Sequence, residues 1–479
     1  MPSRCRRGDV GWRERLRRSA AERSGRRSGR TNAFLRPSAT GVYRPLVTSP
    51  RSPESDRPLR IEAAAAADAT RSVAPAVLLV GAEGSVRDLD RPEAIGSTPE
   101  ATVVEVPNAL LLPGLVNAHA HLDLTSIGPR RFDREAGFAA WAGMIRRERP
   151  ADPEAIGASV RAGVAASLAG GTAVVGDIAG NRGLVAAEAL RASPLRGVAH
   201  IEVFGIGTSE AAGVAFLEEL AARAKAFDGR VRLGVSPHAS YSCGDRLYAK
   251  AASLGLPLAT HLAETSEELR FGRDGSGPLA DLLRAVGVWT PDLRGWRSTP
   301  IERLAGILAP SGAAIAHGNY LEDADLDRLA APADRGSGPP IGIVYCPRAS
   351  TYFGHPAGDA SPHRYRELRD RGVPVALGTD GIVCLDAPDR LSVLDEMRVL
   401  RRRDGADPAT LLAMATDDGA ALLGEPVGHV RLGPGSRPAG VLAVELPEHG
   451  RFATSRQVLR AALESDATPR WMLEPGWNE

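Results

Sequence analysis

Between residues 110 and 381 the chain alternates short apolar segments with segments rich in alanine, leucine and arginine. Most of the apolar segments are continuous hydrophobic runs, which are typical of parallel strands covered by helices on both faces. Eight β/α units within about 300 residues predict an α/β fold, a (β/α)8 TIM-type barrel. A doubly wound open sheet is the alternative, but no GxGxxG sequence follows the first strand. The eight predicted strand segments are 110–122, 172–180, 197–205, 231–240, 256–265, 313–321, 341–350 and 374–381.

Shorter β-like segments lie on both sides of the predicted barrel, at 74–84 and 101–114 before it and at 428–446 after it. The first 60 residues differ, because they are dense in arginine, serine and proline and hold too few apolar residues to offset their ordering entropy. A nucleic-acid-binding arm and a targeting segment are alternatives for this part. The predicted division is a disordered tail at 1–60, a composite β-domain at 61–112 and 425–479, and the barrel at 113–424.

Composition excludes several classes of partner. The formal net charge of +1 gives no general argument for nucleic acid or an anionic membrane. No apolar run approaches the ~20 residues that span a bilayer. The four cysteines form no CxxC pair, which argues against a disulfide framework and favours a reducing cytoplasm. We therefore expect a cytoplasmic protein that binds neither nucleic acid nor membrane.

Histidines and acidic residues occur where the predicted strands end. Two histidines spaced i, i+2 on a strand point the same way, as two ligands of one ion would. Because the carboxyl ends of barrel strands meet at one face, the whole set is expected to gather there and to suit zinc or a similar ion. Each signal alone has another explanation, a structural histidine or a turn at "GTDG". The set is His119, His121, His238, His261, Glu264, His317 and Asp380.

Several motifs resemble the amidohydrolase superfamily, and they occur in the order found there: "LLLPGLVNAHAHLDL", "HLAET", "AHGNYL", "ALGTDG" and "MATDDGAALLG". Within the superfamily they look like the branch that holds cytosine, guanine and S-adenosylhomocysteine deaminases, triazine chlorohydrolases and aminofutalosine deaminase-like proteins. The resemblance runs from about residue 75 to residue 445. It implies a (β/α)8 barrel joined to a small β-sandwich domain built from both chain ends.

The resemblance also implies a metal centre. His119, His121, His261 and Asp380 would hold a divalent metal ion, Zn²⁺ in the first instance, with Fe²⁺ and Mn²⁺ left open. Two-metal members of the family often use a carboxylated lysine at the end of the fourth strand. This chain has only Lys225 and Lys250, both in helical segments, so one metal ion is predicted.

Catalytic roles follow from the same resemblance. Metal-bound hydroxide would attack the substrate, with Asp380 taking the proton from water. Glu264 would protonate a ring nitrogen and pass a proton to the leaving amine, and His317 would orient the hydroxide. The alternative for Glu264 is a structural role beside a helix start in "AETSEE".

Three residues are predicted to bind substrate. His238 is a pocket candidate, with core packing as its alternative. Arg348, in the unusual motif "CPRASTYFGHP", is either a clamp for a substrate carboxylate or a partner in a structural ion pair. Trp141 lies in a segment that is predicted to form a lid and would stack on a ring, unless it is simply core. The chain also has Gly440 where the resembling proteins carry an acidic residue, at a position without a role in metal binding.

These features together predict a metal-dependent aminohydrolase that converts an amidine-type C–NH2 of a purine-like or nucleoside-like heterocycle to C=O and releases ammonia. Hydrolysis of another C–N bond or a C–Cl bond is an alternative, and so is a non-catalytic relative that serves as a scaffold. The expected partner is a small-molecule substrate, and the sequence leaves a homodimer open.

Overall fold

The structure is a computed structural model that describes residues 57–180, 183–227, 229–331, 339–358, 360–386, 389–447 and 454–477. Nearly all of the predicted tail at 1–60 therefore lies outside the described residues. Within these ranges no helix has both the length and the apolar character needed to cross a bilayer.

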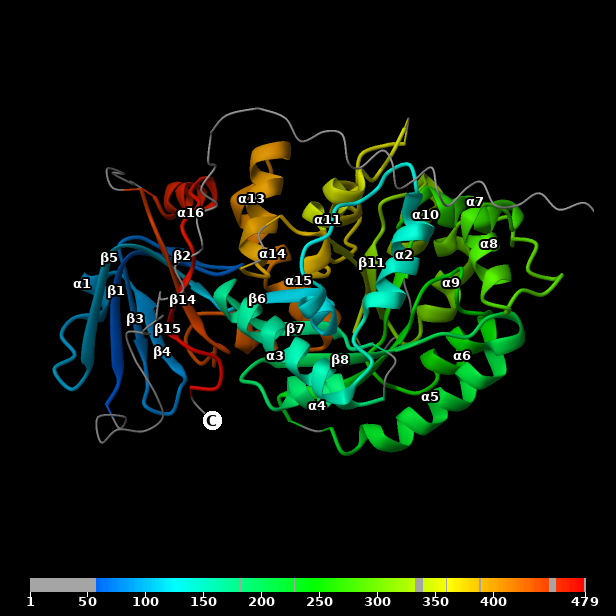
Figure 1. Cartoon of the computed structure of the whole chain (residues 1–479). Helices are drawn as coiled ribbons and strands as arrows, with labels where there is room; N and C mark the ends of the chain where they lie inside the picture. The colour runs from blue at the N-terminus through cyan, green and yellow to red at the C-terminus, as the bar shows by residue number, and fades with distance from the viewer. Residues whose placement is uncertain are drawn as a thin grey trace, which may run out of the picture. The chain divides into compact units, whose positions relative to one another are not determined.

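Eight parallel strands form the centre of the fold (Figure 1). They make two four-stranded sheets, in the orders β6-β7-β8-β9 and β10-β11-β12-β13. A bridge between Ala120 and Asp380 joins one pair of edges, and a bridge between Ala239 and His261 joins the other. The predicted (β/α)8 barrel is thereby confirmed. The strands are Leu115–Ala120, Thr172–Ile178, Arg196–Val203, Val231–Pro237, Ala259–Leu262, Ala313–His317, Ile341–Tyr345 and Val375–Leu377.

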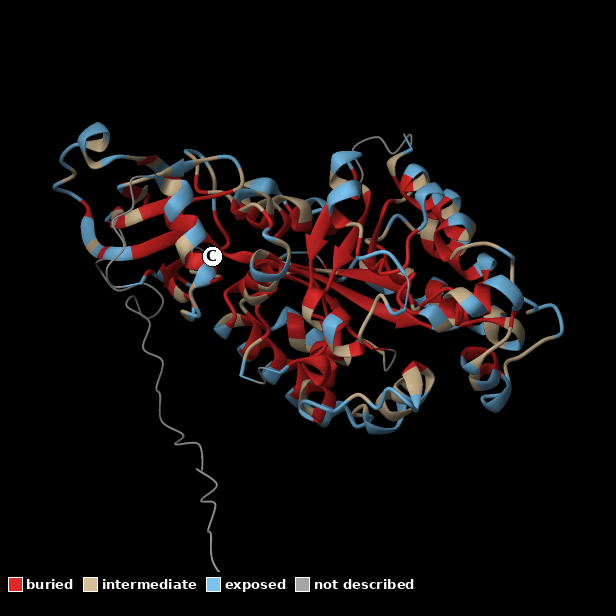
Figure 2. Ribbon diagram, turned by 90° about the horizontal axis from the view of Figure 1, so that it is seen from above, coloured by how far each residue is buried: buried red, intermediate tan, exposed pale blue. Residues whose placement is uncertain are grey.

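Helices surround these strands, whose residues are buried almost throughout (Figure 2). Helix α3 illustrates why they form: it starts at Pro153, and the Asp152 side chain caps it by accepting a hydrogen bond from the Ala155 N–H. Its apolar face, which includes Ile156 and Val160, packs into the main core. The helices that follow the strands are α3 Pro153–Ala169, α4 Val185–Arg191, α5 Glu210–Ala224, α6 Asp245–Ala252, α9 Pro300–Leu308, α10 Asp323–Ala330, α12 Tyr365–Asp370, α14 Pro408–Met414 and α15 Asp417–Leu423.

Further helices are inserted in the loops at the carboxyl ends of the strands. The first of them, α2, belongs to the segment that contains Trp141, and α7 begins directly after the His261–Glu264 motif. These insertions are α2 Gly137–Glu148, α7 Ser266–Asp274, α8 Pro278–Ala285, α11 Pro347–Phe353 and α13 Val393–Asp404.

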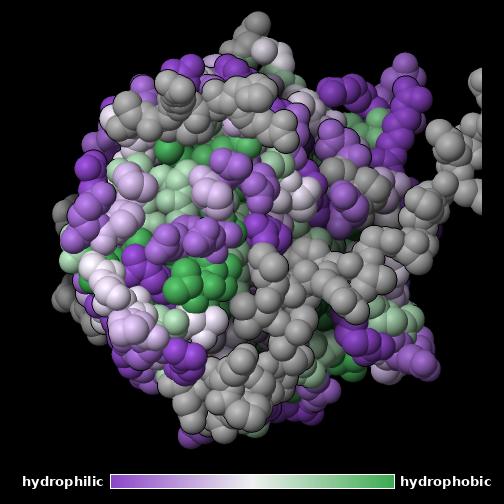
Figure 3. Space-filling view, turned by 90° about the vertical axis from the view of Figure 1, so that its left-hand side faces the viewer, coloured by the Kyte–Doolittle hydropathy of each residue, from purple (hydrophilic) through white to green (hydrophobic). Residues whose placement is uncertain are grey.

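Both chain ends build a second sheet, in the order β15-β14-β5-β1-β3-β4 with β2 beside β1. The long strand β5 pairs in parallel with β1 and antiparallel with β14, so it links the two ends of the chain. Seen from the end that carries this sheet, hydrophobic side chains lie among hydrophilic ones (Figure 3). The elements are β1 Leu59–Ala67, β2 Ser72–Val73, β3 Ala76–Val80, β4 Val86–Asp90, α1 Pro92–Ile95, β5 Thr102–Pro113, β14 Val441–Glu445, α16 Ser455–Glu464 and β15 Arg470–Leu473.

The structure explains Gly440. A Cβ atom at this position would lie 2.5 Å from the ring of Trp471 and 3.0 Å from the Leu473 carbonyl oxygen. The Trp471 indole donates in turn to the Leu168 carbonyl at the end of α3, at 2.9 Å. An acidic side chain at 440 cannot share this space, so the departure from the family pattern comes with a tryptophan that packs the sheet onto the barrel.

Candidate functional site

Three histidines from two distant strands come together at the carboxyl end of the barrel. His119 and His121 lie at the end of β6, and His261 lies on β10. One ring nitrogen from each falls within 4.8 Å of the others, and the Nε2 atoms of His121 and His261 are 3.3 Å apart. All three side chains are buried. The cluster predicted from the sequence is therefore a real juxtaposition.

Asp380 completes this cluster. It follows β13 and bridges to Ala120 of β6, where the two four-stranded sheets meet. Its Oδ1 lies 3.4 Å from His121 Nε2 and 3.8 Å from His119 Nε2. The Asp380 N–H donates to the His119 carbonyl at 3.1 Å, which fixes the two strands relative to each other. Gly378 is needed for this approach, because a Cβ there would lie 2.8 Å from the Cβ of His119.

The donor atoms fit a divalent cation. His119 Nε2, the ring nitrogen that faces Asp380, is buried and has no hydrogen-bond partner among the described residues. Burial, and then the neighbouring His261, holds the pKa of the His119 and His121 imidazoles well below the usual range, so both rings are neutral. Neutral imidazoles and a carboxylate are ready ligands, and a cation would compensate the cost of burying them unpaired.

Glu264 and His317 lie beside the cluster. Glu264 Oε1 is 3.5 Å from His317 Nε2. The backbone of Glu264 is held at both polar atoms, because its N–H donates to Glu268 Oε2 at 2.8 Å and its carbonyl accepts from Asn319 Nδ2 at 3.0 Å. Burial, with the charges of Asp380 and Glu268 added, raises the pKa of Glu264 well above its usual range. The arrangement therefore supports a protonated carboxyl next to the metal ligands.

Backbone strain marks the same region. Among the described residues, four that are not glycine have positive φ, and three of them are at this site: Ala263 at 53°, His317 at 73° and Asp380 at 60°. They follow or end strands β10, β11 and β13. Left-handed conformations cost free energy in residues with a Cβ, and they persist where the surroundings impose a required geometry.

His238 is brought into the site as well. Its carbonyl accepts hydrogen bonds from the His261 N–H at 2.9 Å and from His261 Nδ1 at 2.8 Å, so it orients a predicted metal ligand. Its ring centroid lies 5.2 Å from that of His261. The substrate role assigned to His238 stays a prediction, since contact with substrate is a further step.

Arg348 and Trp141 contact other side chains of the protein. These contacts match the alternatives to their substrate roles, which were a structural ion pair for Arg348 and core packing for Trp141. Arg348 Nε lies 2.6 Å from Glu396 Oε1, and Glu396 is fully buried. Trp141 stacks on Phe138 at 5.9 Å and meets Phe353 edge-on at 4.9 Å. A carboxylate clamp by Arg348 would require the ion pair to open, and its substrate role and that of Trp141 stay predictions.

The sequence interpretation missed a buried charge cluster formed by Asp123, Arg149 and Glu202. Arg149 Nε lies 2.6 Å from Asp123 Oδ2, and its Nη1 lies 2.6 Å from Glu202 Oε2. A glutamate inside the apolar run "HIEVFG" was a usable signal, because an acid in a buried strand needs a partner. Arg149 had no such signal, since it belongs to the charge run "RRER".

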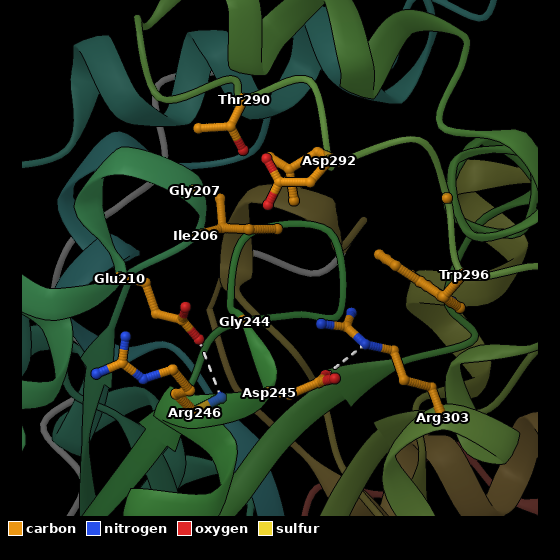
Figure 4. A pocket seen from close by; sticks show the side chains of 12 residues that line it. Ile206, Gly207, Glu210, Gly244, Asp245, Arg246, Thr290, Asp292, Trp296 and Arg303 are labelled. Carbon is orange, nitrogen blue, oxygen red and sulfur yellow. Dashed lines mark hydrogen bonds and ion pairs between the residues drawn. The ribbon is translucent and has the colours of Figure 1, made fainter.

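A separate cavity of about 350 Å³ lies between the loops after β8 and β9 and the segment that precedes α9 (Figure 4). Two of its acidic side chains have partners in the lining: Arg303 Nε is 2.7 Å from Asp245 Oδ1, and Glu210 Oε1 accepts from the backbone N–H of Arg246 at 2.9 Å. None of the predicted metal ligands lines it. The cavity is therefore distinct from the histidine cluster.

A sequence model described as the Amidohydrolase family matches residues 110–434. A 5-methylthioadenosine/S-adenosylhomocysteine deaminase of Natronomonas pharaonis is 29% identical over 357 residues, which cover 71% of this chain and 75% of that protein. A protein of the same name from Nitratidesulfovibrio vulgaris is 28% identical over 398 residues, covering 79% and 81%.

Two solved structures share the fold. An adenosine deaminase from Xanthomonas campestris with bound zinc has a TM-score of 0.65 at 22% identity, and the match covers 88% of this chain and 93% of that one. Helicobacter pylori aminofutalosine deaminase in complex with methylthio-coformycin has a TM-score of 0.69 at 17% identity, with 87% and 98% covered.

Proposed function

Because the chain belongs to the amidohydrolase family of metal-dependent hydrolases, we propose that it is a deaminase that converts the amidine-type C–NH2 group of a purine-like or nucleoside-like heterocycle to C=O. The observation that carries the proposal is the meeting of His119, His121, His261 and Asp380 with Glu264 at one end of the barrel. The deaminase names of the relatives support this reaction over attack on a C–Cl bond or a non-catalytic role.

The metal would be held by His119, His121, His261 and Asp380, and we propose a single Zn²⁺. A cation at this position acidifies water, so that a nucleophile is available at neutral pH. The lysines argue against a bridging carboxylated lysine, because Lys250 is on helix α6 and pairs with Glu218 at 2.8 Å, while Lys225 caps the end of α5.

The side chains supply the proton transfers. Water adds to the carbon that bears the amino group, and Asp380 accepts a proton from that water. Glu264, protonated because of its burial, donates to the adjacent ring nitrogen and makes the carbon more electrophilic. Glu264, now ionised, takes the proton of the new C–OH group and passes it to the amino nitrogen, so the C–N bond breaks, C=O forms and ammonia leaves. The proton held by Asp380 then restores the protonated Glu264. His317, 3.5 Å from Glu264, would orient the water at this carbon.

The test is an ammonia assay with zinc-loaded protein on a panel of aminated heterocycles: adenine, adenosine, 5′-methylthioadenosine and S-adenosylhomocysteine. We expect ammonia release from at least one nucleoside, lost after chelation and regained with Zn²⁺. A chlorinated triazine in the same panel covers the alternative reaction. Chloride release there with no ammonia from any amine would contradict the proposal.

We propose a cytoplasmic location. The described cysteines Cys243, Cys346 and Cys384 are free and buried, in accord with a reducing cytoplasm. The buried site supports a small molecule as the substrate. For the assembly we propose a homodimer, which light scattering would test.

A further inference from the structure

Glu202 is a buried negative charge at the carboxyl end of β8. Its side chain is only 3% exposed. Burial opposes its ionisation, but the charge of Arg149 holds the pKa of Glu202 below its usual range. Oε2 is occupied by Arg149 at 2.6 Å, whereas no described residue donates a hydrogen bond to Oε1. Glu202 therefore keeps one carboxylate oxygen with unused acceptor capacity.

Arg149 is itself fixed, so Glu202 cannot easily turn away. Its guanidinium binds Asp123 through two nitrogens, Nε at 2.6 Å and Nη2 at 3.1 Å, and holds Glu202 with the third. Arg149 also caps helix α2, its N–H donating to the Ile145 carbonyl at 2.8 Å. Two carboxylates share one guanidinium, which leaves this cluster with an excess of acceptors.

The free oxygen faces His238. Glu202 Oε1 lies 3.9 Å from His238 Nε2, too far for a hydrogen bond. The imidazole cannot swing closer, because its Nδ1 shares a hydrogen bond with Ser242 Oγ at 2.7 Å and its face stacks on Phe204 at 4.6 Å. The His238 side chain is 21% exposed, and Phe204 is 41% exposed, so this wall borders open space.

A hydroxyl group fits between the two side chains. It can donate its one proton to the carboxylate and accept from the imidazole, so it satisfies both groups when His238 carries its proton on Nε2. Phe204, two residues beyond Glu202, extends the wall with an apolar face suited to the C–H groups of a sugar. A second carboxylate or a phosphate would be repelled by Glu202.

We propose that Glu202 and His238 bind a hydroxyl group of the substrate at a distance from the amidine carbon, which makes Glu202 a specificity-determining residue for glycosylated heterocycles. Glu202 acts on substrate, while Arg149 and Asp123 are positioning residues behind it. The inference rests on the proposed deaminase function and narrows the substrate class to heterocycles that carry a sugar.

The first experiment uses the wild-type zinc enzyme with its preferred nucleoside and the analogues that lack the 2′-, 3′- or 5′-hydroxyl. We expect kcat/KM to fall by about 10- to 100-fold for at least one analogue, because a hydrogen bond to a charged group is lost. Equal kcat/KM for all analogues overturns this inference alone. Absence of ammonia from every compound overturns the proposed function as well.

The second experiment compares Glu202→Gln with Glu425→Gln. Both glutamates are buried and paired with arginine, at 2.6 Å to Arg149 and 2.7 Å to Arg196, but Glu425 lies at the opposite end of β8. We expect Glu202→Gln to lose its discrimination between the nucleoside and the sensitive analogue, chiefly through KM, with zinc content retained. The Glu425→Gln variant should keep that discrimination.

An equal loss on both substrates by Glu202→Gln would assign the residue a structural role and overturn the inference. Glu202→Asp serves as the conservative variant and should regain part of the discrimination, because it restores the charge. Near-UV circular dichroism on each variant separates misfolding from a change in specificity.

Discussion

The two ends of strand β8 have similar charged side chains nearby, but these side chains differ in whether their polar atoms have partners. At the amino end, Arg196 pairs with Glu425 at 2.7 Å, and His429 Nδ1 reaches the same carboxylate at 2.6 Å. At the carboxyl end, Glu202 has one paired and one unused oxygen, and nearby His119, His121 and Asp177 have buried atoms without partners among the described residues. The carboxylate of Glu425 therefore has two partners, whereas Glu202 keeps one oxygen available.

The difference separates stability from function within one barrel. Buried polar groups without partners destabilise a folded protein, and so do the positive φ angles of His317 and Asp380. Both kinds of cost are found at the carboxyl end, where a cation and a substrate would supply the missing partners. Substitutions at the carboxyl end should therefore lower activity, whereas substitutions at the amino end should lower the free energy of unfolding.

The largest effect is expected from removing a metal ligand. His261→Ala takes away one of the three clustered imidazoles, so we expect less than one bound metal ion per chain and no measurable turnover. Metal content by mass spectrometry and the ammonia assay measure this. His429→Ala, a histidine at the opposite end of the barrel, is the matched control and should keep its metal. Full metal content in His261→Ala would remove His261 from the ligand set.

Glu264→Gln should retain the metal and lose the proton donor. Since general acid catalysis contributes about 10²- to 10⁴-fold, we expect a loss of that size in kcat. Steady-state kinetics with parallel metal analysis distinguishes this result from the previous one. An unchanged kcat would assign Glu264 the structural role beside α7.

At the amino end, Glu425→Ala should affect stability instead. Breaking a buried ion pair leaves Arg196 and His429 without the carboxylate between them, at a cost of about 3 kcal/mol in the free energy of unfolding. Urea denaturation measures this. The kcat/KM of the folded enzyme should stay within about twofold of wild type, because no predicted site residue contacts Glu425. A drop in kcat/KM at normal stability would contradict the separation of the two ends.

The last expected effect is a pH dependence of the free energy of unfolding, from Asp177. Burial raises the pKa of Asp177 to about 8, so the folded protein holds a proton that the unfolded chain releases above its ordinary pKa of 3.8. The free energy of unfolding should therefore fall as pH rises from 4 to 8, by at most about 1.4 kcal/mol per pH unit. Metal-free Asp177→Asn should lack this slope, as unfolding curves at several pH values would show. The same slope in both proteins would place the titration elsewhere.

The barrel could be predicted from the sequence because its strands are continuous apolar runs, and all eight are found in the structure. The histidine cluster could be predicted because each member ends a strand, and the barrel geometry brings strand ends together. The Arg149–Glu202 contact could not be predicted, because the partners are 53 residues apart and "RRER" offers three arginines. The partner of Arg348 could not be predicted either, because Glu396 lies 48 residues further along the chain.

The sequence by itself determined the eight-strand pattern and the side chains placed where the strands end, since period and spacing are local properties of the chain. Only the tertiary structure decided which acids are paired, which stay available and which backbones are strained. Those states depend on burial and on atoms from distant segments, as Glu202 and Glu425 show: the same residue type is open to a ligand at one end of β8 and occupied at the other.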